Sequence, residues 1–238
     1  MGISRYLAMT KGEMAHFSCP DGYFPGWMAC HFSPYGTGLS NFPRQLSPGS
    51  MLILNDRTPI CGHDPMLIRQ QLEAAVVAYG CDSVLLDFQR PDAEETAALC
   101  AVLTKGLPCP VGISDLYAKE TDGPVFLSPV PVDILPKEHL APWQGREIWL
   151  EIAPEAEEIT VTENSSTTQL LPSLPERDGF FDDTLCCRYF QEVGSREIRF
   201  TLWRDTAALE ALTETVAALG ITRTVGLFQD FVRDRGIP

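Results

Sequence analysis

Three stretches of the chain repeat one arrangement, in which an amphipathic helix ends at a glycine and an apolar strand follows. In the first stretch, Asp64 is placed to cap a helix whose first residue is Pro65. Gly80 ends this helix, and the apolar run 83–88 comes next. Helices that alternate with short apolar strands predict a parallel sheet with the helices outside it.

The other two stretches follow the same order. The second helix begins with Asp92 as its cap and leads through Gly106 to the strand 111–114. The third helix is capped by Asp205 and ends at Gly220. The apolar stripe of this helix consists of Leu209, Leu212, Val216 and Leu219. The strand that follows it is 225–228.

Five more apolar runs are strand candidates, which brings the total to eight. These runs are 5–9, 28–32, 51–54, 125–127 and 147–152. Eight strands with intervening helices in 238 residues predict an α/β fold, a compact (β/α)₈ TIM barrel that forms a single domain over 1–238. An open doubly wound sheet is the rival fold, but no G-x-G-x-x-G motif follows a strand.

The stretch 157–204 interrupts this rhythm and is expected to be an insertion before the last helix. Within it, 159–162 is typical of a strand, and 163–179 is rich in Ser, Thr and Pro and predicts a loop. The runs 187–190 and 196–203 flank a short turn and predict a β-hairpin.

Charge and composition exclude several classes of partner. The chain carries 18 basic and 32 acidic residues, a net charge of −14, which disfavours binding to nucleic acid or anionic membranes. No apolar run is long enough to span a membrane, and residues 1–6 do not resemble a secretory signal, so we expect a cytoplasmic protein. The eight cysteines form no C-x-x-C pair and the four histidines are scattered, so we expect reduced thiols, no metal site and no cofactor.

Polar side chains follow several of the expected strands. In a barrel of this kind, function gathers at the carboxyl ends of the strands. Carboxylates and amides surrounded by aromatic rings suit sugar binding or glycoside chemistry, because that chemistry uses a positioned acid and a stabilising carboxylate. The candidate ligand-binding residues on this basis are Asp56, Asp87, Gln89, Asp115, Glu151, Phe228 and Asp230.

The stretch Tyr79–Pro91 carries the most specific motif. It resembles the fourth strand of glycoside hydrolase family 18, the chitinase-like TIM barrels, whose pattern there is Y-G-x-D-G-[VI]-D-[IVL]-D-[FW]-E. Asp82, Asp87 and Phe88 match this pattern, whereas Leu85 replaces the middle Asp. Gln89 replaces the Glu that donates the catalytic proton in that family.

These departures bear on activity. An amide such as Gln89 has no proton to donate at neutral pH. The family's M-x-Y-D motif on its sixth strand would fall near 127–130, where the Tyr and the Asp are missing. The resemblance therefore implies a barrel of this family that lacks chitinase activity. Strand alternation still places Leu85, Asp87 and Gln89 on the interior face, where Gln89 can bind a sugar.

Three functions remain open at this point. The favoured one is a non-catalytic or altered-activity protein that binds a carbohydrate-like small molecule or glycan. The second is an active hydrolase that uses Glu151 as the acid, with Asp87 or Asp230 as its partner. The third is a structural or interaction protein whose cleft is vestigial.

Overall fold

The computed structural model describes residues 2–60, 62–91 and 94–232. The chain forms two compact units. We call Met1–Ser128, Gly145–Glu151 and Thr222–Gln229 the barrel unit, and Pro129–Gln144, Ile152–Ile221 and Asp230–Pro238 the sheet unit. That the two units form a single domain over 1–238 stays a prediction.

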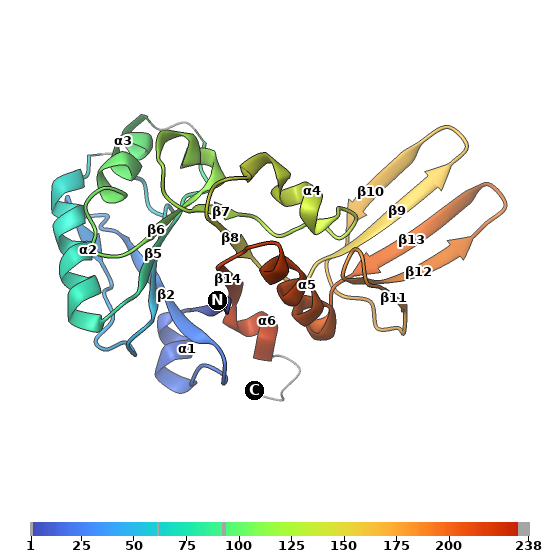
Figure 1. The fold of residues 1–238 in the computed structure, drawn as a ribbon, viewed down its shortest axis with the longest axis horizontal. Helices are drawn as coiled ribbons and strands as arrows, with labels where there is room; N and C mark the ends of the chain where they lie inside the picture. Colours follow the sequence, from blue (N-terminus) through green and yellow to red (C-terminus); the bar gives the residue numbers. More distant parts are fainter. Residues whose placement is uncertain (1, 61, 92–93, 233–238) are drawn as a thin grey trace. The chain divides into compact units, whose positions relative to one another are not determined.

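The barrel unit contains a closed ring of eight parallel strands (Figure 1). Their order around the ring is β1-β14-β8-β7-β6-β5-β4-β2, and β2 pairs with β1 to close it. The short β3 (Leu39–Ser40) pairs antiparallel with β2 and is an addition to the ring. The ring confirms the predicted (β/α)₈ barrel. Its strands are β1 (Ser4–Met9), β2 (Phe24–Phe32), β4 (Met51–Asn55), β5 (Ser83–Asp87), β6 (Val111–Ser114), β7 (Val125–Leu127), β8 (Ile148–Glu151) and β14 (Arg223–Leu227).

The first predicted helix has the expected ends. It is α2 (Pro65–Tyr79), whose cap Asp64 accepts a hydrogen bond from the Met66 N–H. Gly80 follows with φ +65°, a left-handed conformation that a residue without Cβ adopts easily. The predicted cap Asp92 lies outside the described residues. The remaining helices of this unit are α1 (Lys11–His16), α3 (Glu94–Leu103) and the 3₁₀ helix η1 (Asp115–Glu120), and α6 (Phe228–Val232) follows β14.

The barrel interior is filled by large side chains. Trp149 is fully buried and lies so close to Gly112 that a Cβ on this glycine would be 2.2 Å from the Trp149 ring. Apolar neighbours from five other strands pack beside Trp149 in the interior. The buried members of the interior cluster are Tyr6, Ala8, Met51, Ile53, Leu85, Phe126, Trp149 and Val225.

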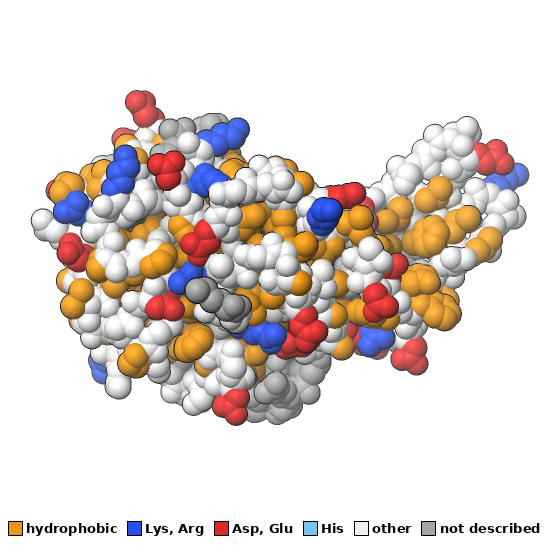
Figure 2. All heavy atoms as spheres, viewed as in Figure 1, with side chains coloured by type: hydrophobic (Ala, Val, Ile, Leu, Met, Phe, Trp, Pro, Cys, Tyr) orange, Lys and Arg blue, Asp and Glu red, His pale blue; other side chains and the backbone are white. Residues whose placement is uncertain are grey.

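The sheet unit holds a five-stranded antiparallel sheet with the order β10-β9-β13-β12-β11. Apolar side chains gather on one of its faces (Figure 2). The predicted hairpin is confirmed as β12–β13, which pair antiparallel. The strands are β9 (Ala156–Thr162), β10 (Ser166–Leu170), β11 (Phe180–Asp182), β12 (Cys187–Val193) and β13 (Glu197–Trp203).

Two sequence predictions in this unit were wrong in part. The segment 163–179 was expected to be a loop, yet it contains β10. Its Ser and Thr side chains did not signal a strand, because the strand pairs through its backbone and buries none of them. Leu219 was expected in the apolar stripe of α5 (Thr206–Ala218), but it is 44% exposed at the end of that helix. The cap Asp205 is confirmed.

A buried arginine holds several loops of the sheet unit together. Arg204 is 0% exposed, and its guanidinium donates hydrogen bonds to the carbonyls of Cys186, Val130, Pro131 and Leu185. Burial lowers the pKa of Arg204, while the nearby Glu155 and Glu157 favour its charged form. The other helices of this unit are α4 (Pro136–Leu140) and the 3₁₀ helix η2 (Ala141–Trp143).

Candidate functional site

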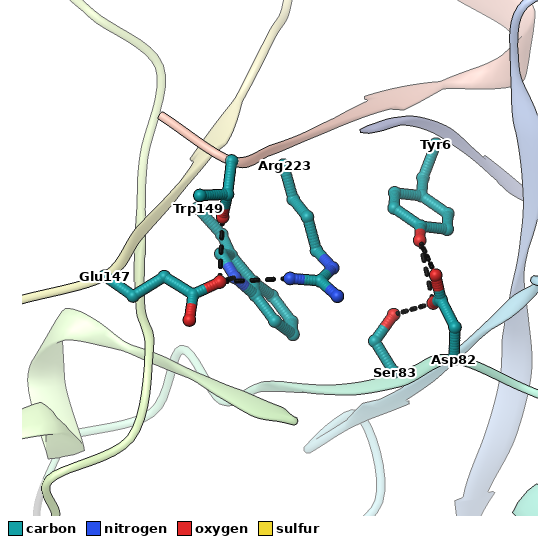
Figure 3. Close-up of polar contacts among 7 residues, drawn as sticks. Tyr6, Asp82, Ser83, Glu147, Trp149 and Arg223 are labelled. Carbon is teal, nitrogen blue, oxygen red and sulfur yellow. Dashed lines mark hydrogen bonds and ion pairs between the residues drawn. The ribbon is translucent and has the colours of Figure 1, made fainter. Parts of the chain in front are cut away.

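Paired polar groups lie at the amino ends of the barrel strands (Figure 3). Glu147 accepts hydrogen bonds from Trp149 Nε1 at 2.9 Å and from the Arg223 guanidinium at 3.0 Å. The guanidinium also lies 4.8 Å from the centre of the Trp149 ring. These contacts hold the starts of β8 and β14 together, and we assign them a structural role.

Asp82, which matches the family motif, also lies at this end. Tyr6 Oη donates to its carboxylate at 2.7 Å, and Ser83 Oγ does so at the same distance (Figure 3). Burial and the hydrogen bond to Asp82 raise the pKa of Tyr6 to about 12, so the phenol stays protonated as a donor. In this chain Asp82 therefore fixes the start of β5 against β1.

A cavity of about 290 Å³ opens inside the barrel at the carboxyl ends of its strands. Leu85, Asp87 and Gln89 all line it, which confirms the alternation predicted for β5. Glu151, from the end of β8, lines the same cavity, so the structure brings three predicted site residues together. The other lining residues are Ala8, Met28, Ile53, Asn55, Phe126, Ser128, Val225, Gly226 and Leu227.

Asp87 and Gln89 form a pair at this cavity. Gln89 Nε2 donates to Asp87 Oδ1 at 2.6 Å. Burial raises the pKa of Asp87, and the carboxylate of Asp56 raises it further. The hydrogen bond from Gln89 and the charge of Arg57 act in the opposite direction. Asp87 consequently holds a proton more readily than an ordinary aspartate, which is a property of many functional carboxyl groups.

Asp56 has a different place from the one expected. It is 8% exposed and does not line the cavity, because the strand alternation turns it to the outer side of β4. Its Oδ2 accepts hydrogen bonds from the N–H groups of Gln89 at 3.0 Å and Arg90 at 2.7 Å. Asp56 thus positions the segment that carries Gln89 and is not itself a lining residue.

Asn55 is a lining residue that the sequence-based selection missed. It is the register partner of Asp87 on the neighbouring strand, and its Nδ2 donates to the Met28 carbonyl at 3.3 Å. The signal was present in the sequence, because Asn55 shares the parity of Met51 and Ile53, which point inward. The sequence favoured Asp56 because of its charge, but strand alternation places its uncharged neighbour Asn55 at the cavity.

Three other predicted residues do not join the cavity. Phe228 is 2% exposed and packs against Phe17 with ring centres 5.7 Å apart, so its face is not available for a sugar to stack on. Asp115 is exposed at the start of η1 and is not among the lining residues. Asp230 belongs to the sheet unit and lines a separate cavity of about 330 Å³ there.

A larger cavity of about 590 Å³ also lies in the barrel unit. Met9, Met14 and Phe17 are among the residues that line it, and none of the described lining residues is a carboxylate. We assign the candidate site to the smaller cavity, since two carboxyl groups and two amides converge there at the catalytic end of the fold.

Within the described residues, no three His, Cys, Asp or Glu side chains come together in a way that would hold a metal ion. The same part of the chain contains no helix that is long and apolar enough to cross a membrane. The seven cysteines that the structure describes are all free thiols, five of them buried.

Comparisons with known proteins bear on the fold. No family model matches the chain, and no curated protein sequence matches it. The solved structure of the Bacillus cereus spore cortex-lytic enzyme SleL is similar, with a TM-score of 0.55 and 10% identity over 94% of this chain and 70% of that one. SleL from Bacillus megaterium gives a TM-score of 0.52 with 8% identity, covering 98% of this chain and 73% of that one.

A third similar structure is that of the putative sporulation-specific glycosylase ydhD from Bacillus subtilis. Its TM-score is 0.50 with 8% identity, covering 84% of this chain and 90% of that one. At these identities the likeness establishes the barrel architecture alone.

Proposed function

We propose that the protein binds a carbohydrate in the cavity at the carboxyl end of its barrel, without chitinase activity. The observation that carries this proposal is the convergence of Asp87, Gln89 and Glu151 on one cavity that has an apolar floor. Sugars offer hydroxyl groups to such carboxylates and amides and apolar ring faces to such a floor. The printed names of the similar structures, a spore cortex-lytic enzyme and a glycosylase, make a glycan the first ligand to test.

The family resemblance of β5 supports the non-catalytic part of the proposal. Gln89 stands where that family has its proton donor, and its amide is occupied in a hydrogen bond to Asp87. An amide does not transfer a proton to a leaving oxygen at neutral pH. Asp87 and Gln89 are then best suited to hold sugar hydroxyl or acetamide groups. We also propose, from composition, a cytoplasmic location, no cofactor, and no nucleic-acid or membrane partner.

A second candidate function is glycoside hydrolysis by the carboxyl groups of Asp87 and Glu151. It is favoured by one observation, namely that both side chains line the same cavity. The raised pKa of Asp87 suits it as the group that protonates the leaving oxygen. Glu151 would then act on the opposite side of the sugar, as base or nucleophile. In the sequence analysis Glu151 was the acid and Asp87 or Asp230 its partner. Here Asp87 is the acid and Glu151 its partner, so Asp230 has no role in the reaction.

Binding and hydrolysis are separated by one set of variants. Asp87→Ala removes a lining carboxylate, and Asp115→Ala is its matched control, because Asp115 is exposed outside the cavity. The native chain is screened on an array of chitooligosaccharides and cell-wall glycans, and the affinities of both variants for each hit are measured.

We expect Asp87→Ala to weaken binding roughly 5- to 150-fold and Asp115→Ala to leave it unchanged. Release of chromophore from a chitooligosaccharide substrate, abolished by Asp87→Asn and by Glu151→Gln, would favour the second candidate. If the native chain binds no glycan and turns over no substrate, both candidate functions are refuted and the cleft is vestigial.

A further inference from the structure

The two edges of the five-stranded sheet are built differently. At one edge lies β11, which is three residues long and has Asp178, Asp182 and Asp183 in or beside it. At the other edge lies β10, which is five residues long and carries no charge and no proline. Short strands and charges are the usual means by which proteins prevent an edge from pairing with another chain. The β11 edge has this protection, and the β10 edge does not.

The open side of β10 presents backbone groups in regular order. The Leu171 N–H bonds to the Ala156 carbonyl, and the Ser165 carbonyl accepts from the Thr162 N–H, so odd-numbered residues bond toward β9. In an antiparallel ladder the alternate residues face the other way. The N–H and C=O groups that point away from β9 therefore belong to Ser166, Thr168 and Leu170, and all five residues of β10 are exposed.

This edge is complementary to itself. If two β10 strands meet antiparallel across a two-fold axis at Thr168, then Thr168 pairs with its own copy and Ser166 pairs with Leu170. These are the three residues with outward backbone groups, and each pair exchanges two hydrogen bonds, which gives about six in all. The opposed side chains are Ser, Thr, Gln and Leu, so no like charges meet across the axis.

The charge of the whole chain favours this edge as the contact. With a net charge of −14, two copies repel each other over most of their surfaces. A β11–β11 contact would bring acidic residues together, whereas a β10–β10 contact would not. We propose that the protein forms a two-fold dimer in which β10 of one copy pairs antiparallel with β10 of a second copy, joining the two five-stranded sheets.

The test is the mass of the native chain in solution and of three variants, measured by analytical ultracentrifugation from about 1 μM to 1 mM. Thr168→Pro removes an outward N–H at a position that makes no bond to β9, and Thr168→Lys places two ammonium groups opposite each other on the axis. Thr184→Lys is the matched control, because it makes the same change at an exposed position beside the other edge.

We expect the native chain and Thr184→Lys to reach twice 26.3 kDa with rising concentration. Both Thr168 variants should raise the dimer dissociation constant by about tenfold or more, with melting curves that match the native chain. A native chain that stays monomeric throughout would overturn the proposal. So would Thr168 variants that keep native melting curves and dimerise as the native chain does. If both Thr168 variants lose the native melting curve, hydrogen exchange on the native dimer decides. Protection of the Thr168 amide that increases with protein concentration supports the pairing. Absence of such protection overturns the proposal.

Discussion

The guanidinium of Arg204 is expected to be the largest single stabilising group in the sheet unit. It is completely buried and donates to four carbonyl oxygens from two separate segments of the chain, 130–131 and 185–186. The change that tests this is Arg204→Met, which keeps an unbranched apolar stem of similar length and removes the donors and the charge.

The magnitude follows from the partners. The Pro131 carbonyl keeps a hydrogen bond from the Ile134 N–H, whereas the Val130, Leu185 and Cys186 carbonyls lose the donor that Arg204 supplies. A buried acceptor that loses its donor costs about 1–3 kcal/mol, so three cost about 3–9 kcal/mol. The variant no longer has a charge to bury, so it avoids a desolvation cost of several kcal/mol. The net loss in the free energy of unfolding is then roughly 2–5 kcal/mol.

The assay is equilibrium unfolding in urea, followed by tryptophan fluorescence and far-ultraviolet circular dichroism. Arg204→Lys should recover part of the loss, because an ammonium group donates three hydrogen bonds but does not have the planar fork. Arg196→Met is the control, since Arg196 is exposed in the β12–β13 turn and should change stability by less than about 0.5 kcal/mol. If Arg204→Met is as stable as this control, the reasoning about the buried hydrogen bonds is wrong.

Three further outcomes are expected. The raised pKa of Asp87 means that its stabilising contribution is complete below the unfolded pKa of about 3.9 and is lost as the pH rises through the folded value. Asp87→Asn should therefore raise the melting temperature at pH 7 and give a smaller difference at pH 4, and a lower melting temperature at pH 7 would identify Asp87 as scaffold. Gln89→Glu should not give the chain full chitinase turnover, because the family's strand-six Tyr is also absent, and rapid release of product by this variant would contradict the account. Gly112→Ala should destabilise the barrel by at least about 1–3 kcal/mol in thermal unfolding, because its Cβ would lie 2.2 Å from the Trp149 ring, and an unchanged melting temperature would contradict the close packing.

The ring of strands was predictable because each barrel strand is an apolar run bounded by helix ends or turn residues. All eight predicted runs correspond to strands of the ring, with boundaries that differ by a few residues. Buried parallel strands carry this signal in their own side chains. The edge strand β10 does not, because its partner supplies backbone hydrogen bonds and its side chains stay in solvent.

The candidate site was predictable to the extent that strand alternation determines it. Asp87, Gln89 and Glu151 follow that alternation and line the cavity, whereas Asp56 was selected for its charge and has the opposite parity. The burial of Phe228 depends on Phe17, which is more than 200 residues earlier in the sequence. A contact between such distant segments leaves no local pattern, so its effect on the site could not be predicted from the sequence.

The central claim is that a carbohydrate binds in the cavity that Asp87 and Gln89 line, and methionine methyl NMR tests it directly. Met28 lines this cavity, Met9 and Met14 line the larger one, and Met66 is exposed on α2. During titration with the best glycan from the array, we expect the Met28 methyl signal to shift with saturation while the Met66 signal stays in place. A shift at Met9 and Met14 with Met28 unchanged would place the ligand elsewhere and contradict the claim.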